Sequence, residues 1–212
     1  MSSFLYPSLT PQQIAGDHDT SEFEAELLLE LANTVRGTWS DAVAFDCRSV
    51  TANREALNQA AALVVACATS GGRVLVMGNG GSACDAERLV RLLQPAVPAR
   101  TLLDPAVFSA IANDVGAARV FSRQVETFAS SRDVVVVFTT SGTSANVIEA
   151  VGAGKRALAS TIAFAGYRGA TLATHADVDV CISVDSTSVH RIQEAQGALC
   201  DAFVALVQAG LT

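Results

Sequence analysis

The sequence lacks the features that mark several large classes of protein. Its 14 basic residues face 21 acidic ones and form no run, and the formal charge is -7, so nucleic acid and anionic membranes are poor partners. Every apolar run ends well before the roughly 18 residues that a membrane span needs. The first residues, MSSFLYPSLTPQQ, do not follow the basic, apolar, small-residue order of a signal peptide. We therefore expect a soluble cytoplasmic protein.

Cysteine pairs with a recognisable spacing are also missing. The five cysteines are an odd number, and none of them is spaced as CxxC. This scatter indicates small buried hydrophobic residues in a reducing compartment. No internal repeat or low-complexity tract is evident. With 212 residues, 50% of them hydrophobic, the chain can bury one full core.

The first 72 residues are predicted to hold a loose arm and two helices. Residues 1–20 contain Pro, Ser, Thr and Gln with little periodicity and predict a flexible arm. Apolar residues recur at helical spacing from Ser21 to Val35, and again in an alanine-rich segment from about Arg48 to Thr69 that ends at Gly71 and Gly72. We expect this pair to pack against another subunit or, as the alternative, against its own sheet, within a single domain at 21–212.

Short apolar strands then alternate with helices. The expected strands are 73–77, 100–103, 133–138, 160–164 and 178–184. One expected helix begins at Ser82, and five others span 107–112, 118–128, 144–151, 169–174 and 187–208. Strands that are apolar without alternation predict an α/β fold with a parallel sheet covered on both faces. In such sheets, ligands bind beyond the carboxyl ends of the strands.

One glycine-rich turn joins the first strand to the next helix. Gly78-Asn79-Gly80-Gly81 is followed by Ser82, which suits the N-cap position. Such a junction directs backbone N–H groups and the positive end of the helix dipole at an anion, most often a phosphate. The alternative is that these glycines only make a tight turn.

A second turn follows the strand 133–138. Residues Thr139 to Ser144 place five hydroxyls within six residues. Hydroxyls and backbone amides can hold a dianion without a lysine, although a single Ser/Thr cluster can also serve only to cap a turn. Together the two turns predict a two-sided cradle for a sugar phosphate.

Five motifs resemble, in order and spacing, the SIS-domain sugar isomerases, most closely the sedoheptulose 7-phosphate (phosphoheptose) isomerases. They are GNGGSACDA, AIANDVG, VFSRQVE, TTSGTSANVI and RIQE, and the likeness runs from about Leu57 to Val207. The resemblance implies a flavodoxin-like three-layer sandwich around a parallel central sheet, a homotetramer with shared active sites, and a heptose-type phosphorylated sugar as partner. It implies these substrate-binding residues: Asn79, Gly80, Ser82, Thr139, Thr140, Ser141 and Ser144 around the phosphate, Asp114 at the sugar hydroxyls, and Gln193 lining the site.

The chain departs from that family where its members bind zinc. The family's His and Glu on the helix after GNGGS are here Arg88 and Leu92, and its histidines three and eight residues beyond the RIQE glutamine are here Gln196 and Asp201. Only Gln193 remains of the usual ligands. Arginine has no lone pair to give and leucine has no donor atom, so we expect no metal and no cofactor.

The same departures leave the acid and base of an isomerase unassigned. Arg88 and Asp201 either form an ion pair that fills the vacated space, or act in catalysis, with Asp201 or Glu87 as the base and Arg88 stabilising an enediolate. His190 is either a substitute acid or a surface residue.

Three functions are compatible with these residues. The first is a metal-independent phosphoheptose-type isomerase, and the second is a non-catalytic SIS protein that acts as a sugar-phosphate sensor or a protein-binding regulator. The third is a dinucleotide-dependent oxidoreductase, because Gly78, Gly80 and Ala83 satisfy GxGxxA and Asp104 ends the next expected strand. Two helices precede the fingerprint and the hydroxyl-rich turn has no role in that fold, so the third is the weakest.

Overall fold

A computed structural model describes residues 20–212, and their side chains from residue 24 onward. The arm predicted at 1–20 lies outside the described residues except for Thr20. Tertiary contacts divide the chain into a unit up to Val43 and a unit Ala44–Thr212, and each unit is described by itself.

The helix α2 (Thr20–Ala52) is longer than the pattern up to Val35 predicted. The segment after Val35 contains Gly37 but no proline, and one glycine costs only about 1 kcal/mol relative to alanine in a helix, so the helix continues. In the first unit several large apolar side chains of α2 are exposed: Leu28, Leu29, Val35, Trp39 and Val43.

The second helix, α3 (Arg54–Thr69), ends as predicted in a glycine cap. The N–H of Gly71, whose φ is +71°, donates to the Ala68 carbonyl, and the N–H of Gly72 donates to the Cys67 carbonyl. This is the Schellman pattern, in which a left-handed glycine satisfies the last helical carbonyls. The cap turns the chain directly into the first strand.

Five parallel strands form the sheet: β1 (Val74–Gly78), β2 (Ala99–Thr101), β3 (Val134–Thr139), β4 (Ser160–Ala165) and β5 (Val180–Ser183). Their order is β2-β1-β3-β4-β5. This is the flavodoxin-like order, so the predicted fold class is confirmed.

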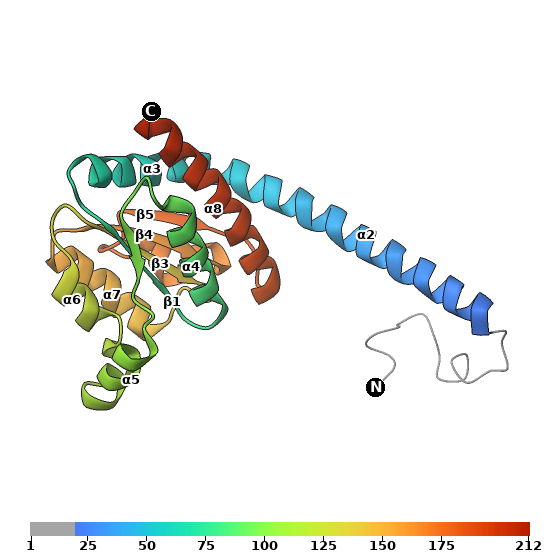
Figure 1. The fold of residues 1–212 in the computed structure, drawn as a ribbon, viewed down its shortest axis with the longest axis horizontal. Coiled ribbons are helices and arrows are strands. Elements are labelled where there is room, and N and C mark those ends of the chain that lie inside the picture. The colour runs from blue at the N-terminus through green and yellow to red at the C-terminus, as the bar shows by residue number, and fades with distance from the viewer. Residues whose placement is uncertain (1–19) are drawn as a thin grey trace. The chain divides into compact units, whose positions relative to one another are not determined.

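Helices cover both faces of this sheet (Figure 1). Along β1, Val74 and Val76 belong to a core shared with α3, α4 (Gly81–Leu93) and α8 (Val189–Leu211), whereas Leu75 and Met77 belong to a core shared with α6 (Ser122–Phe128) and α7 (Ala145–Arg156). Both faces of each central strand are therefore buried, which explains the continuous apolar runs.

Three further helices complete the described fold: α5 (Pro105–Asp114), η1 (Ala117–Arg119) and η2 (Tyr167–Thr174). The helix expected at 118–128 is divided into η1 and α6, and the one expected at 169–174 is a 3-10 segment that starts earlier. Asp104 does not end a strand but caps α5, since its carboxylate accepts from the N–H groups of Ala106 and Val107.

The cysteine prediction holds only in part. Cys67 and Cys200 are buried, Cys181 is half-buried, and Cys47 and Cys84 are exposed. Among the helices that the structure describes, none has the length and apolar character needed to cross a bilayer.

The side chain of Asn53 ties the start of α3 to the edge strand β5. Its Oδ1 accepts from the N–H of Ser183 and its Nδ2 donates to the Ser183 carbonyl, both at 2.8 Å. The residue is buried, so these two bonds replace water that cannot reach the groups. Edge strands lack a partner on one side, and here Asn53 supplies part of one.

We predict that Asn53→Ala lowers the free energy of unfolding by about 1–3 kcal/mol, because the Ser183 backbone groups lose their buried partner. Urea unfolding monitored by circular dichroism measures the change. Asn58→Ala, at an exposed position of α3, is the control and should lie within about 0.5 kcal/mol of the wild type. Equal effects of the two substitutions would contradict the role assigned to Asn53.

Candidate functional site

The glycine-rich turn and the hydroxyl-rich turn lie side by side at the carboxyl edge of the sheet. The strands β1 and β3 that precede them are neighbours, with Gly78 opposite Phe138. Beyond the strands, the Asn79 and Asn146 side chains exchange two hydrogen bonds, each amide nitrogen donating to the other's oxygen at 2.9 Å. This reciprocal clasp connects the first turn to the start of α7.

The glycine-rich turn folds tightly onto α4. A Cβ at Gly78 would lie 2.5 Å from the Ser82 carbonyl oxygen, and Gly80 has a φ of +56°, so both positions favour glycine. Gly80, not Ser82, is the N-cap. Ser82 is the second residue of α4 and is buried, so the predicted capping role is wrong, because the N-cap lies two residues earlier in the chain than predicted.

The hydroxyl-rich turn uses some of its hydroxyls to shape itself. The Thr139 Oγ1 accepts from the N–H of Gly142 at 3.1 Å, and the Ser141 Oγ accepts from the N–H of Thr143 at 3.3 Å. A hydroxyl that accepts still carries a proton to donate. Ser144 is the N-cap residue of α7, and its side chain makes no capping hydrogen bond. The turn can therefore keep its shape and still offer hydroxyl donors to an anion.

Two glutamines of α8 lie at this edge of the sheet. Gln193 lies against the glycine-rich turn, since a Cβ on Gly81 would be 1.9 Å from its Nε2. Gln196 is fully buried, and its Nε2 donates to the carbonyls of Thr139 and Phe164 at 3.1 and 3.2 Å. Gln196 therefore holds the ends of β3 and β4 together, a framework role that the sequence did not indicate.

Arg88 and Asp201 form the ion pair that the sequence raised as one of two possibilities. The Arg88 Nη2 lies 2.6 Å from both carboxylate oxygens of Asp201, which joins α4 to α8. This hydrogen bond is the main cause that raises the pKa of Arg88, so the guanidinium stays charged. The side chains are 43% and 57% exposed, and the pair is therefore screened by water.

Asp85 is a partly buried carboxylate near Arg88 that the sequence did not single out. It lies on α4 one turn before Arg88, and its Oδ2 is buried without a hydrogen-bond partner. Burial raises the pKa of this carboxyl to about 6, and the charge of Arg88 offsets part of that rise. The residue is part of the GNGGSACDA motif, but only its burial distinguishes it from an ordinary helix surface residue.

The remaining candidate residues do not contact the two turns through hydrogen bonds or ion pairs in the described part of the chain. Asp114 is the last residue of α5 and its carboxylate accepts from the Asn113 amide at 2.8 Å. Within the described part of the chain, neither it nor Glu87 or His190 has a hydrogen bond or ion pair to either turn, and all three are exposed.

The residues at the family's zinc positions do not fit a zinc ion. A guanidinium, which is a cation without an acceptor, lies bonded to the one carboxylate there, Asp201, and Gln196 has its amide nitrogen committed to backbone carbonyls. From residue 24 onward no three His, Cys, Asp or Glu side chains lie close enough to share a metal ion. Gln193 alone cannot form a structural or catalytic zinc site.

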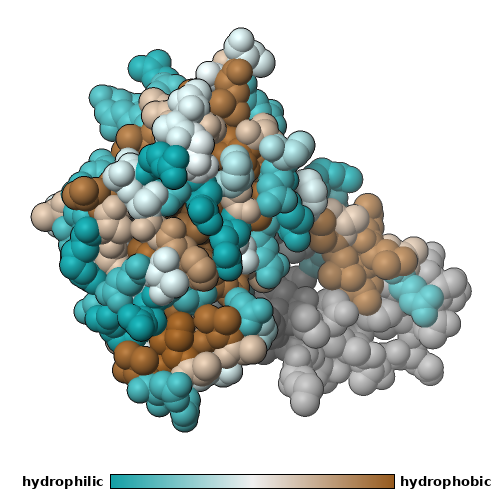
Figure 2. Space-filling model, turned by 60° about the vertical axis from the view of Figure 1, so that its left-hand side comes forward, coloured by the Kyte–Doolittle hydropathy of each residue, from teal (hydrophilic) through white to brown (hydrophobic). Residues whose placement is uncertain are grey.

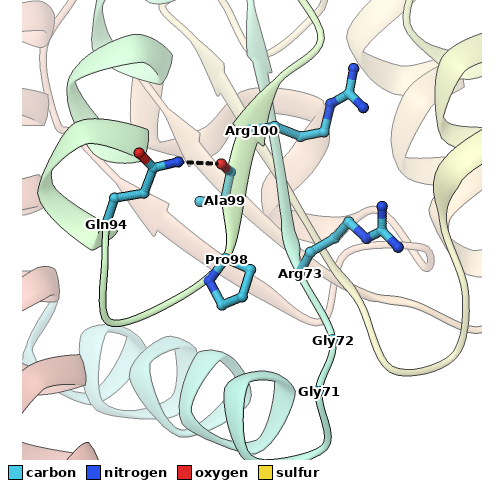
Figure 3. A pocket seen from close by; sticks show the side chains of 7 residues that line it. All are labelled: Gly71, Gly72, Arg73, Gln94, Pro98, Ala99 and Arg100. Carbon is cyan, nitrogen blue, oxygen red and sulfur yellow. Dashed lines mark hydrogen bonds between the residues drawn. The ribbon is translucent and has the colours of Figure 1, made fainter.

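The hollow drawn in Figure 3 belongs to the opposite edge of the sheet. It measures about 380 Å³ and lies where β1 and β2 begin, beside Arg73 and Pro98. Arg73 and Arg100 extend to one side of these strands, while Gln94 on the other side donates to the Ala99 carbonyl at 2.8 Å. It shares no residue with either turn.

Comparisons with known proteins point to one family. The family model described as the SIS domain matches residues 38–166. The phosphoheptose isomerase of Roseiflexus sp. (strain RS-1) is 38% identical over 161 residues, 69% of this chain and 81% of that protein. That of Thiobacillus denitrificans (strain ATCC 25259 / T1) is 40% identical over 164 residues, 71% of this chain and 83% of that protein. The structure of phosphoheptose isomerase GmhA from Neisseria gonorrhoeae superposes with a TM-score of 0.77 at 34% identity, covering 84% of this chain and 99% of that one.

We predict that replacing Arg88 by Gln together with Asp201 by Asn changes the free energy of unfolding by less than about 1 kcal/mol, because half-exposed ion pairs contribute little. Urea unfolding measures it. The pair Arg168–Asp185, which is 77% and 69% exposed, is the matched control and should be without effect. A loss above about 2 kcal/mol would instead make Arg88–Asp201 a structural pair that stabilises the fold.

Proposed function

Because this chain belongs to the SIS-domain family, in the branch of the phosphoheptose isomerases, we propose that it binds a phosphorylated sugar at the edge formed by its two turns. The observation that carries this proposal is the parallel pairing of β1 with β3, with Gly78 opposite Phe138, because it brings both turns out at one edge of the sheet. The phosphate is received by the hydroxyls and amides of the turns, from Asn79, Gly80, Ser82, Thr139, Thr140, Ser141 and Ser144. Neutral donors suit a dianion that must also be released.

The sugar part of the ligand extends along α4 toward α8. Gln193 lies beside the glycine-rich turn and lines this path, and Asp114 meets sugar hydroxyls once the assembled protein brings it near. The substrate class is a heptose-type ketose phosphate, and the reaction is ketose–aldose isomerisation without a metal. The cytoplasm is where such a sugar phosphate and this chain would meet.

One observation favours a second function, a non-catalytic sugar-phosphate sensor or protein-binding regulator. The Arg88–Asp201 pair neutralises the carboxylate at a position where the family has a catalytic group. A protein that has lost turnover but keeps the two turns would still bind the sugar phosphate. Binding and turnover must therefore be measured separately.

The chain acts as a homo-oligomer, with a tetramer as the state that the family resemblance supports. The exposed apolar side chains of α2, among them Trp39 at 70%, need cover in water. In Figure 2, apolar side chains also gather low on the second unit, where Figure 1 places α5, and Val107 and Val115 are exposed there. Burying α5 between subunits would carry Asp114 toward a site.

We predict that Ser141→Ala weakens the binding of sedoheptulose 7-phosphate about tenfold or more, because a hydrogen bond to a charged group contributes about 1.5–3 kcal/mol. Isothermal titration calorimetry on the full chain measures the dissociation constant. Ser131→Ala, at an exposed position in the loop before β3, is the control and should bind like the wild type. Equal affinities for all three proteins would place the phosphate elsewhere.

We predict that the wild type retains no zinc, whereas the variant carrying Arg88→His, Leu92→Glu and Asp201→His binds about one zinc per chain. The substitutions remove the guanidinium and supply, with Gln193, four donor atoms. Metal content after dialysis against zinc and then buffer measures this. Equimolar zinc in the dialysed wild type would show that its own residues do form a metal site.

A further inference from the structure

Asp85 and Arg88 leave two complementary polar atoms unused on one face of α4. The Asp85 Oδ2 and the Arg88 Nε are both shielded from water and have no hydrogen-bond partner. Residues three apart on a helix are neighbours, so this pair could have satisfied itself, yet Arg88 turns its Nη2 to Asp201 instead. Folded proteins rarely leave buried polar atoms unpaired, and a bound ligand is one reason to do so.

The charged surroundings of Asp85 come from two helices. On α4 itself Arg88 is the cation that acts on it. On α8, Cys200 and Asp201 face the same space: burial and then the charge of Asp85 raise the pKa of the Cys200 thiol, which therefore stays neutral. Asp201 is paired with Arg88. Asp85 is thus the one carboxylate of this group without a bonded cation.

The position of the pair fits a ligand anchored at the turns. Ser82, Asp85 and Arg88 follow one another at three-residue spacing on α4, so they form a row that leads away from the glycine-rich turn. At a rise of 1.5 Å per residue, Ser82 and Arg88 are about 9 Å apart along the axis. An extended sugar phosphate whose phosphate lies at the turns would bring its far end to this row.

We propose that Asp85 is the proton-transferring catalytic residue of this site and that Arg88 is its electrophilic partner, both acting on the hydroxy-carbonyl end of a 2-ketose phosphate. The inference rests on the proposed function. The hydroxyl of such a ligand donates to Asp85 Oδ2, and its carbonyl oxygen accepts from Arg88 Nε. Both atoms then have a hydrogen-bond partner. Both residues are partly exposed, and the proposal requires that their side chains rotate to present these atoms to the ligand.

The reaction balances without any co-reactant. The Asp85 carboxylate takes a proton from C1, the C1–H electron pair forms the C1=C2 bond, and the carbonyl π pair moves to O2, whose negative charge the guanidinium stabilises. Protonated Asp85 then returns the proton to C2, and the O1 hydroxyl proton passes to O2 as O1 becomes the carbonyl. C1 is oxidised and C2 is reduced within one molecule. Neither Asp201, held by Arg88, nor exposed Glu87 is needed as the base.

The test is proton exchange at C1 of sedoheptulose 7-phosphate in D₂O, followed by proton NMR with the full chain. The wild type should exchange and isomerise the sugar, with a rate that rises with pH through about 6. Asp85→Asn should slow exchange about a hundredfold or more while calorimetry shows a dissociation constant within about threefold of the wild type. Glu149→Gln, exposed on α7, is the matched control and should leave both quantities unchanged.

A stability measurement adds a readout that does not depend on turnover. Because burial raises the pKa of Asp85 from 3.8 to about 6, its charged form opposes folding above that range and ceases to do so as the pH falls toward 3.8. Asp85→Asn should therefore raise the melting temperature by about 2 °C or more at pH 8, and the gain should shrink toward pH 4. A lower melting temperature at pH 8 would make Asp85 a structural residue and overturn the proposal.

The outcomes separate this inference from the proposed function. Tight binding of the sugar phosphate without exchange by the wild type would refute the role of Asp85 and leave the sensor function standing. Exchange that survives Asp85→Asn would also refute it. A wild type that neither binds nor exchanges would show that both proposals are wrong.

Discussion

The parallel pairing of β1 with β3 is the contact on which both halves of the candidate site depend. Each strand is buried on both faces, so its register is set by side chains that enter the two cores. Once Gly78 lies opposite Phe138, the chain that leaves each strand must emerge at the same edge. The hydrophobic core therefore brings the glycine-rich and hydroxyl-rich turns together, and the polar bonds between them only adjust their fit.

The space between α4 and α8 shows how one added positive charge changes which ligands a site can bind. In place of ligands that attract a metal cation, the chain presents the guanidinium of Arg88. A fixed positive charge repels a second cation and stabilises negative charge that develops beside it. Arginine at this position is therefore a poor ligand for zinc, and its guanidinium is the group that the proposed reaction uses as an electrophile.

Much of the fold could be predicted from the sequence because it depends on local patterns. The apolar runs located all five strands to within a few residues, and the glycine cap after Thr69 was recognised from Gly71 and Gly72. The length of α2 was missed because one glycine does not end a helix. The arm at 1–20 and the division of the chain into domains stay predictions.

The candidate site was harder to predict, because the role of each polar side chain depends on which groups it contacts in the folded protein. Nothing local separates Gln196, which holds two strand ends, from Gln193, which faces the turn, and only burial distinguishes Asp85 from exposed Glu87. The pairing of Arg88 with Asp201 could be foreseen only because the family resemblance placed both positions near one point. Positions 113 residues apart carry no such information in composition or periodicity.

The hydrogen bonds between Asn79 and Asn146 depend on an asparagine that is prone to deamidation. Asn79 is exposed and is followed by Gly80, and an asparagine before glycine loses its amide most readily, since the unhindered backbone nitrogen can attack the side chain. Deamidation would replace the donor nitrogen of Asn79 by a second oxygen, which would face the oxygen of Asn146 and repel it. One slow hydrolysis would thus remove one of the two hydrogen bonds between the glycine-rich turn and α7 and set two oxygens against each other in its place.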